Sequence, residues 1–121
     1  PILFNHILTK RKNMVCKLHE VVNFVREYNL LNDLSDEEIK ENFGLFPHAC
    51  SWDKQLGISM VDCDQLDIIV DKTLEVLDLA FDHEYTRDQI HQVATTFCDV
   101  FKAAEAPKKP VAFVVVLLSR L

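Results

Sequence analysis

The sequence predicts an all-α fold, a single-domain bundle of four to five helices, and three observations support this prediction. Apolar residues recur at helical spacing, only two glycines and four prolines occur among 121 residues, and two short stretches match the capping box that starts helices. A β-sandwich or barrel turns about every 8–12 residues and usually places glycine there. We therefore expect one helical domain over residues 1–121, in which 106–121 form a linker and an apolar tail.

The N-terminal segment predicts one long helix over about residues 2–29. Neither glycine nor proline occurs between Ile2 and Phe43, and an apolar face keeps one register through the segment. Asn13 leaves an alternative open, because an asparagine can cap a second helix that follows a short first one. The register does not slip across residues 10–13, which favours the single helix.

A short helix is expected over residues 36–44. Ser35 and Glu38 form a capping box, in which each side chain accepts a hydrogen bond from the backbone amide of the other, and Gly44 marks the end of the helix. The following stretch, residues 46–61, is the least regular part of the sequence and predicts a loop. Its aromatic and aliphatic residues would make an unusually adhesive surface if exposed, so we expect the loop to pack onto the protein.

The longest amphipathic pattern predicts a central helix over residues 62–82. Asp62 is a favourable N-cap, with Gln65 at the matching third position. Apolar residues cover almost every side of this helix, which is typical of a helix packed on several sides. At about 100° per residue, six carboxylates fall within a sector of about 80°. This acidic stripe consists of Asp64, Asp67, Asp71, Glu75, Asp78 and Asp82.

Thr86 and Gln89 form the second capping box and predict a helix over residues 86–105. We expect it to form an antiparallel hairpin with the helix over 62–82, packed against the N-terminal helix. The tail that follows is apolar on every side over residues 111–118, and these eight residues are too few to span a membrane. Because a single strand cannot satisfy its own backbone, the tail is expected either to form a buried helix or to add as a strand to a partner.

Charge is distributed unevenly along the chain. Residues 33–88 contain fifteen Asp and Glu against four Lys and Arg, a formal charge of −11, whereas residues 1–32 carry +3 and residues 89–121 carry +2. Binding to nucleic acid needs clustered basic residues, so nucleic acid is not an expected partner. Three surroundings for the acidic stripe stay open: solvent, the basic N-terminal segment of the same chain, and a basic surface of another protein.

Four cysteines occur at positions 16, 50, 63 and 98, without a CxxC motif. We interpret them as reduced thiols of a cytoplasmic protein; if they prove to be disulfides, a secreted protein is expected instead. Cys16, His19, His48 and Cys50 are the residue types of a Cys₂His₂ zinc site, but their spacing matches no standard zinc finger. Neither a metal nor a cofactor is therefore expected.

The leading functional hypothesis is a non-catalytic protein-interaction domain or a small subunit of a larger assembly. The sequence has no motif for phosphate binding, nucleophilic catalysis or metalloprotease chemistry, so we do not expect an enzyme. Surplus apolar surface beside a stripe of one charge sign favours binding to another protein or self-association. The predicted partner-binding residues are the six carboxylates of the acidic stripe together with Trp52, Phe113 and Val115.

Two resemblances supply alternative functions. A small acidic helical chain with four cysteines and an apolar C-terminal tail is similar to insect odorant-binding proteins, which implies a secreted, disulfide-bonded carrier of a small apolar ligand; the closely spaced cysteine pair of that family has no counterpart here. The stretch 34–46 resembles the entering helix of an EF-hand. That resemblance implies a degenerate module without calcium, because Ser51, Asp53 and Gln55 match ligand positions but Leu56 replaces the required glycine.

Overall fold

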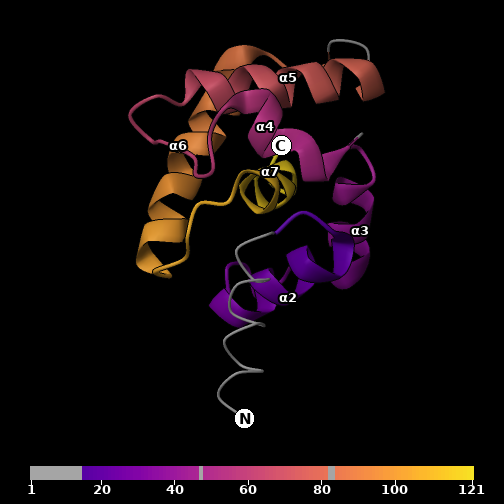
Figure 1. The fold of residues 1–121 in the computed structure, drawn as a ribbon, viewed down its shortest axis with the longest axis vertical. Helices are drawn as coiled ribbons and strands as arrows, with labels where there is room; N and C mark the ends of the chain where they lie inside the picture. The colour runs from indigo at the N-terminus through magenta and orange to yellow at the C-terminus, as the bar shows by residue number, and fades with distance from the viewer. Residues whose placement is uncertain (1–14, 47, 82–83) are drawn as a thin grey trace.

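Helices account for the regular secondary structure of the residues that the structure describes, which confirms the all-α prediction (Figure 1). The computed structural model describes residues 15–46, 48–81 and 84–121, and these ranges contain no strand. Their buried side chains form one continuous hydrophobic core. The elements are α2 (Leu18–Tyr28), α3 (Asp36–Phe43), the 3₁₀ helix η1 (Ala49–Ser51), α4 (Trp52–Leu56), α5 (Asp67–Phe81), α6 (Arg87–Ala103) and α7 (Pro110–Leu118).

The C-terminal helix α7 forms the centre of the bundle. It contacts α2, α3, α4, α5 and α6, and Figure 1 shows it end-on among them. Every residue from Pro110 to Leu117 is buried. Pro110 occupies the first turn, where its fixed φ suits a helix and no intrahelical hydrogen bond is lost. The apolar tail is therefore a buried helix of this chain, and the alternative of a strand added to a partner is wrong.

The predicted arrangement around residues 62–82 needs correction. This segment was expected at the centre, but α5 lies at the periphery, because α7 has no charged side and takes the central place. The helices α5 and α6 pack against each other and both contact α7, and α7 lies between α5 and α2 (Figure 1). The figure also shows α5 and α6 crossing steeply, whereas an antiparallel hairpin against the N-terminal helix was expected.

Helix α5 begins at Asp67 and not at residue 62. The Asp62 carboxylate accepts a hydrogen bond from the Asp64 amide at 2.9 Å, and the Asp62 carbonyl accepts one from the Gln65 amide at 3.0 Å. Side-chain bonding of this local kind stabilises a turn in competition with a helix. The two N-caps that the capping boxes predicted lie where the sequence placed them: the Ser35 side chain accepts from the Glu38 amide before α3, and Thr86 and Gln89 form the complete box before α6.

The prediction of one helix over residues 2–29 is wrong, because α2 begins at Leu18. Lys17 has extended backbone angles, and its amide donates to the Glu20 carboxylate at 3.0 Å. Lys17 is therefore the N-cap, and the helix begins at the next residue. Residues 2–14, among them Asn13 of the alternative interpretation, lie outside the described residues.

The stretch 46–61 packs onto the protein as expected, but it contains η1 and α4 and is not a plain loop. Trp52 is fully buried and stacks on Phe46 with ring centroids 4.5 Å apart. The EF-hand resemblance matches Ser51, Asp53 and Gln55 to ligand positions of a module that does not bind calcium. Those positions belong to η1 and to the helical turns of α4, so they do not form a calcium-binding loop.

Two disulfides link distant parts of the chain. Cys16, just before α2, is bonded to Cys50 of η1, and Cys63, in the turn before α5, is bonded to Cys98 of α6. The interpretation of the cysteines as reduced thiols is therefore corrected. In the described part of the chain, none of the helices has both the length and the apolar character that crossing a membrane requires.

Candidate functional site

The solvent-facing side of α5 carries most of the predicted acidic stripe. Residues three or four positions apart are neighbours on a helix surface, so four of the six carboxylates adjoin one another there. Asp64 lies instead in the turn before α5, and Asp82 lies outside the described residues. We call the four carboxylates on the helix the acidic ridge: Asp67, Asp71, Glu75 and Asp78.

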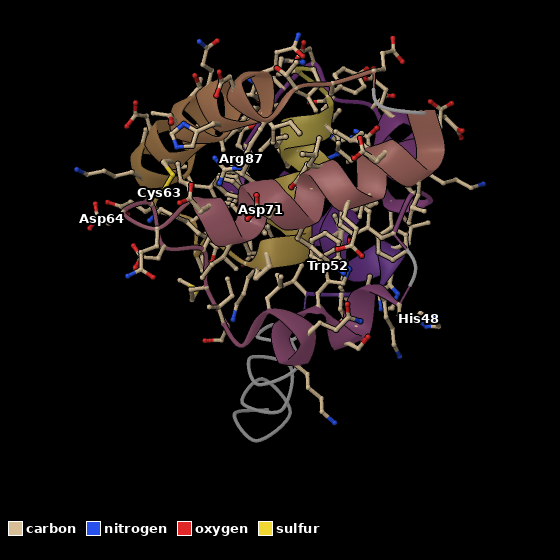
Figure 2. The ribbon with its side chains drawn as sticks, turned by 90° about the horizontal axis from the view of Figure 1, so that it is seen from above. His48, Trp52, Cys63, Asp64, Asp71 and Arg87 are labelled. Atoms are coloured by element: carbon tan, nitrogen blue, oxygen red, sulfur yellow. A yellow bond between two sulfur atoms is a disulfide. The ribbon has the colours of Figure 1, made fainter. Side chains whose placement is uncertain are left out.

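Arg87, the first residue of α6, pairs with the N-terminal end of the acidic ridge (Figure 2). Its Nη2 donates to Asp67 Oδ1 at 2.8 Å and its Nε donates to Asp71 Oδ1 at 2.9 Å. The hydrogen bond to Asp67, then that to Asp71, and the negative charge of both carboxylates raise the pKa of Arg87 above its ordinary value. Because all three side chains are exposed, the pairing fixes where α6 crosses α5 more than it adds stability.

Sequence reasoning did not find this role of Arg87. The residue lies 16 positions from Asp71 and 20 from Asp67, so only the crossing of the two helices brings the charges together. The basic N-terminal segment is the intramolecular source of positive charge that the sequence leaves open, and its cluster at residues 10–12 lies outside the described residues.

Lys72 lies at the edge of the acidic ridge and turns toward α4. Its Nζ donates to Gln55 Oε1 at 2.9 Å, lies 3.6 Å from Glu75 Oε1, and stands 5.6 Å from the centroid of the Trp52 ring. The acidic ridge has four carboxylates and the two cations named here are Lys72 and Arg87, so these six side chains sum to a formal charge of −2.

Apolar side chains flank the C-terminal half of the acidic ridge. Leu79 is 78% exposed, the most exposed of the large apolar side chains in the described residues, and Leu74 is half-buried. Together with three ridge carboxylates they line a shallow hollow of about 540 Å³ on the protein surface. We call this hollow the α5 groove; its lining residues are Asp71, Leu74, Glu75, Asp78 and Leu79.

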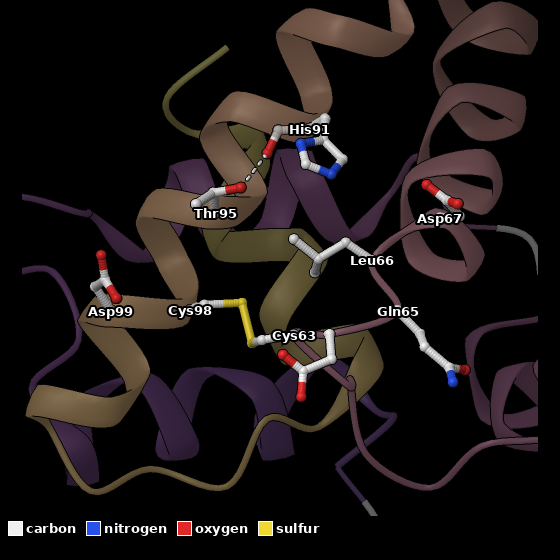
Figure 3. Close-up of a pocket in the computed structure, with 9 residues that line it drawn as sticks. Cys63, Gln65, Leu66, Asp67, His91, Thr95, Cys98 and Asp99 are labelled. Carbon is white, nitrogen blue, oxygen red and sulfur yellow. Dashed lines mark hydrogen bonds between the residues drawn. A yellow bond between two sulfur atoms is a disulfide. The ribbon is translucent and has the colours of Figure 1, made fainter.

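A second hollow, of about 470 Å³, lies beside the Cys63–Cys98 disulfide (Figure 3). The turn before α5, the first residue of α5 and one side of α6 line it. The Thr95 hydroxyl in this hollow donates a hydrogen bond to the His91 carbonyl at 2.9 Å, within α6. Across residues 15–46, 48–81 and 84–121, no three His, Cys, Asp or Glu side chains are arranged to hold a metal ion.

The three apolar residues predicted to bind a partner lie elsewhere. Trp52, Phe113 and Val115 are each 0% exposed and belong to the hydrophobic core. They contact the rest of this chain because α7 and α4 close the bundle, so they do not offer a surface to another molecule. The structure thus separates the predicted set into carboxylates on the surface and apolar residues in the interior.

Comparisons of the chain with models of protein families, with curated proteins and with solved structures found no match.

Proposed function

We propose that this chain is a non-catalytic protein-interaction domain that binds another protein through the exposed face of α5. The observation that carries the proposal is the exposure of Leu79 beside the acidic ridge. Nearly all other large apolar side chains of the described residues are covered, so a leucine that is 78% exposed within a charged groove stands out. Apolar contact area with a rim of charge is the usual composition of a protein-binding surface.

The charge of the α5 face favours a different protein over a second copy of this chain. In a two-fold symmetric dimer the same patch meets itself, so carboxylates would face carboxylates. Like charges placed together across an interface cost several kcal/mol, whereas basic side chains of a different protein would be attracted to the carboxylates. We therefore infer that the partner is a protein with a basic surface.

The two disulfides support a working environment outside the cytoplasm. Disulfides persist in oxidising compartments and are rare where thiols are kept reduced. All four cysteines are paired, which is the pattern of a domain that relies on cross-links for stability. We therefore place the proposed interaction in a secreted setting and not in the cytoplasmic one that the sequence first favoured.

A pull-down with matched variants tests the proposal. Wild-type protein, Glu75→Lys with Leu79→Ser, and a control with Glu37→Lys and Met60→Ser are immobilised and exposed to the extracellular fluid of the source organism. Glu37 and Met60 are also exposed but lie outside the α5 groove. We expect a protein that is retained by wild type and control and lost from the α5 variant. Equal retention by all three would contradict the proposal.

A carrier of a small apolar ligand is the second candidate, because the paired cysteines agree with a secreted carrier. Such a carrier needs a mostly apolar pocket, whereas both hollows described above have carboxylates in their lining. Titration with a fluorescent apolar probe, N-phenyl-1-naphthylamine, decides between the two. Saturable binding that the α5 variant leaves unchanged would favour the carrier.

A further inference from the structure

We propose that the Cys16–Cys50 disulfide is a site of thiol–disulfide exchange, at which a low-molecular-weight thiol such as glutathione attaches to Cys50 and opens the bond. The site joins the start of α2 to η1, so it is independent of the binding proposed for the α5 face. Three observations carry the proposal: the exposure of Cys50, the charges around the two disulfides, and the other contacts that hold α2 and η1 in place.

The two disulfides differ in exposure. Cys50 is exposed, and its partner Cys16 is half-buried. In the other disulfide Cys98 is only 9% exposed, and Cys63 is half-buried. Exchange begins when a thiolate approaches one of the two sulfurs, so its rate depends on access, and exposed disulfides are more labile than buried ones. A thiolate in solution therefore has its best access at Cys50.

Charge disfavours exchange at the other disulfide. The hollow beside Cys63 and Cys98 is lined by three carboxylates, those of Asp64, Asp67 and Asp99 (Figure 3). Its described lining contains His91 but neither lysine nor arginine. A thiolate is an anion, and glutathione carries a net negative charge as well, so these carboxylates repel the attacking reagent. Exposure and charge thus favour the same bond, Cys16–Cys50.

Glu20 favours attack at Cys50 over attack at Cys16. Its Oε1 lies 4.0 Å from Cys16 Sγ, so a thiolate that approaches Cys16 meets a negative charge. In the proposed step the glutathione sulfur forms a bond to Cys50 Sγ while the Cys16–Cys50 bond breaks. The electron pair of the broken bond leaves on Cys16 Sγ, which takes a proton from water. One disulfide replaces another, so no further oxidant or reductant is consumed, and the new Cys16 thiol can donate to Glu20.

The segments that this disulfide joins are also held by other contacts. Helix α2 buries Val21, Phe24 and Val25 in the core. The 3₁₀ helix η1 leads directly into α4, whose Trp52 is fully buried and stacks on Phe46. Exchange therefore removes the covalent link between η1 and the start of α2 while both segments stay packed. A bond that opens in this way, without unfolding of the domain, acts as a redox-sensitive switch.

Mass mapping after exchange tests the proposal. The fully oxidised protein is incubated with excess reduced glutathione near neutral pH, and samples taken over time are treated with N-ethylmaleimide and digested without reductant. We expect glutathione on Cys50 and maleimide on Cys16, while Cys63 and Cys98 remain bonded to each other. The first disulfide should open at least about tenfold faster than the second. Circular dichroism and the fluorescence of Trp52, the single tryptophan, report whether the product remains folded.

Matched variants test the role of Glu20. Glu20→Gln removes the charge beside Cys16 and keeps a side-chain oxygen that can accept from the Lys17 amide. The control Glu37→Gln makes the same change at an exposed position of α3. We expect the share of glutathione found on Cys16 to rise at least about twofold in Glu20→Gln and to stay as in wild type in the control.

Several results would overturn the proposal. Opening of both disulfides at equal rates, or of Cys63–Cys98 first, would contradict the selectivity. A folded protein that gains no glutathione on Cys50 would show that this disulfide is inert. Unfolding in step with the appearance of the adduct would show that the link is structural and not a switch. An unchanged distribution of glutathione in Glu20→Gln would overturn the role given to that carboxylate.

Discussion

The helices α5 and α7 show two ways in which an apolar segment is held in this small domain. Helix α7 has no charged residue in its nine positions and is surrounded by five other helices. Helix α5 has apolar residues on several sides as well, but four carboxylates and Lys72 keep one side in solvent. Burial on all sides is the main contact that holds α7 in place, whereas α5 is held by burial on one side and by charged and covalent links at its N-terminal end.

Charge, more than the length of the apolar pattern, therefore decides which helix lies at the centre of the bundle. Burying an ionised side chain costs several kcal/mol even after relaxation, so a helix with a carboxylate on each turn of one face stays at the surface. A helix without charges can be enclosed completely, and the bundle then forms around it.

The largest expected effect tests this contrast directly. Val115→Lys puts an unpaired charge at a position that is 0% exposed, and we expect a loss of about 3–5 kcal/mol in the free energy of unfolding. Leu79→Lys on α5 makes the same kind of change at a position that is 78% exposed and should stay within about 0.5 kcal/mol of wild type. Urea denaturation followed by circular dichroism measures both.

If Val115→Lys were as stable as wild type, α7 would not be enclosed by the chain. The contrast between a buried α7 and a peripheral α5 would then be wrong. The typical stability of a domain is about 5–15 kcal/mol, so the variant is expected to be marginally folded or unfolded. Leu79→Lys serves as its control, since it adds the same side chain in the other helix.

The disulfides give the next largest effect. Replacing Cys63 and Cys98 by alanine opens a link across 35 residues, and chain entropy predicts a loss of about 3–4 kcal/mol. Replacing Cys16 and Cys50 opens a link across 34 residues and should cost about as much, roughly 3–4 kcal/mol. Under conditions where the protein stays folded, hydrogen exchange should speed up in α5 when the first link is opened and stay slow in α7. Equal acceleration in both helices would mean that the link supports the whole core and not its periphery.

Arg87→Gln is expected to have a small effect on stability and a larger one on binding. The three side chains are exposed, so the free energy of unfolding should fall only slightly, and less at high salt. The substitution leaves Asp67 and Asp71 without their cation, so the basic protein that the pull-down retains should bind up to about fivefold more tightly, the range of one surface ion pair. Weaker binding of that protein would mean that Arg87 shapes the α5 groove through its contact with α5.

Much of this fold can be predicted from the sequence because its signals are local. Ser35 and Thr86 satisfy amides within their own first turn, so the starts of α3 and α6 follow from four consecutive residues. The start of α5 could not be predicted in this way. Asp62 can stabilise either a turn or the N-terminus of a helix. Which of the two forms depends on the surrounding structure.

The candidate site depends on contacts between distant residues and was predicted only in part. The acidic ridge follows from helical periodicity, so the sequence placed its four carboxylates on one face. The roles of Arg87 and Leu79 depend on how α6 crosses α5 and on which side α7 packs, which no local pattern contains. For the same reason Trp52, Phe113 and Val115 were expected at a surface although the bundle encloses them.

The smallest expected effect concerns the end of α7. Arg120, just beyond that helix, donates through Nη2 to both carboxylate oxygens of Asp33, at 2.8 Å and 3.0 Å. This hydrogen bond to Arg120 is the main cause that lowers the pKa of Asp33 below its ordinary value of 3.8. A carboxylate with a lowered pKa in the folded state stabilises that state above the unfolded pKa, and the contribution is lost as pH falls through the folded pKa.

Asp33→Asn should therefore melt slightly below wild type at about pH 6, and the difference should shrink below about pH 4 and vanish in stronger acid. High salt should reduce the difference at about pH 6, because both side chains are exposed and the charges are screened. Arg120→Gln is the matched variant, since it removes the other member of the same pair. A difference that persists unchanged at low pH would show that Asp33 acts through its position in the turn between α2 and α3, and α7 would then be held by burial without help from charge.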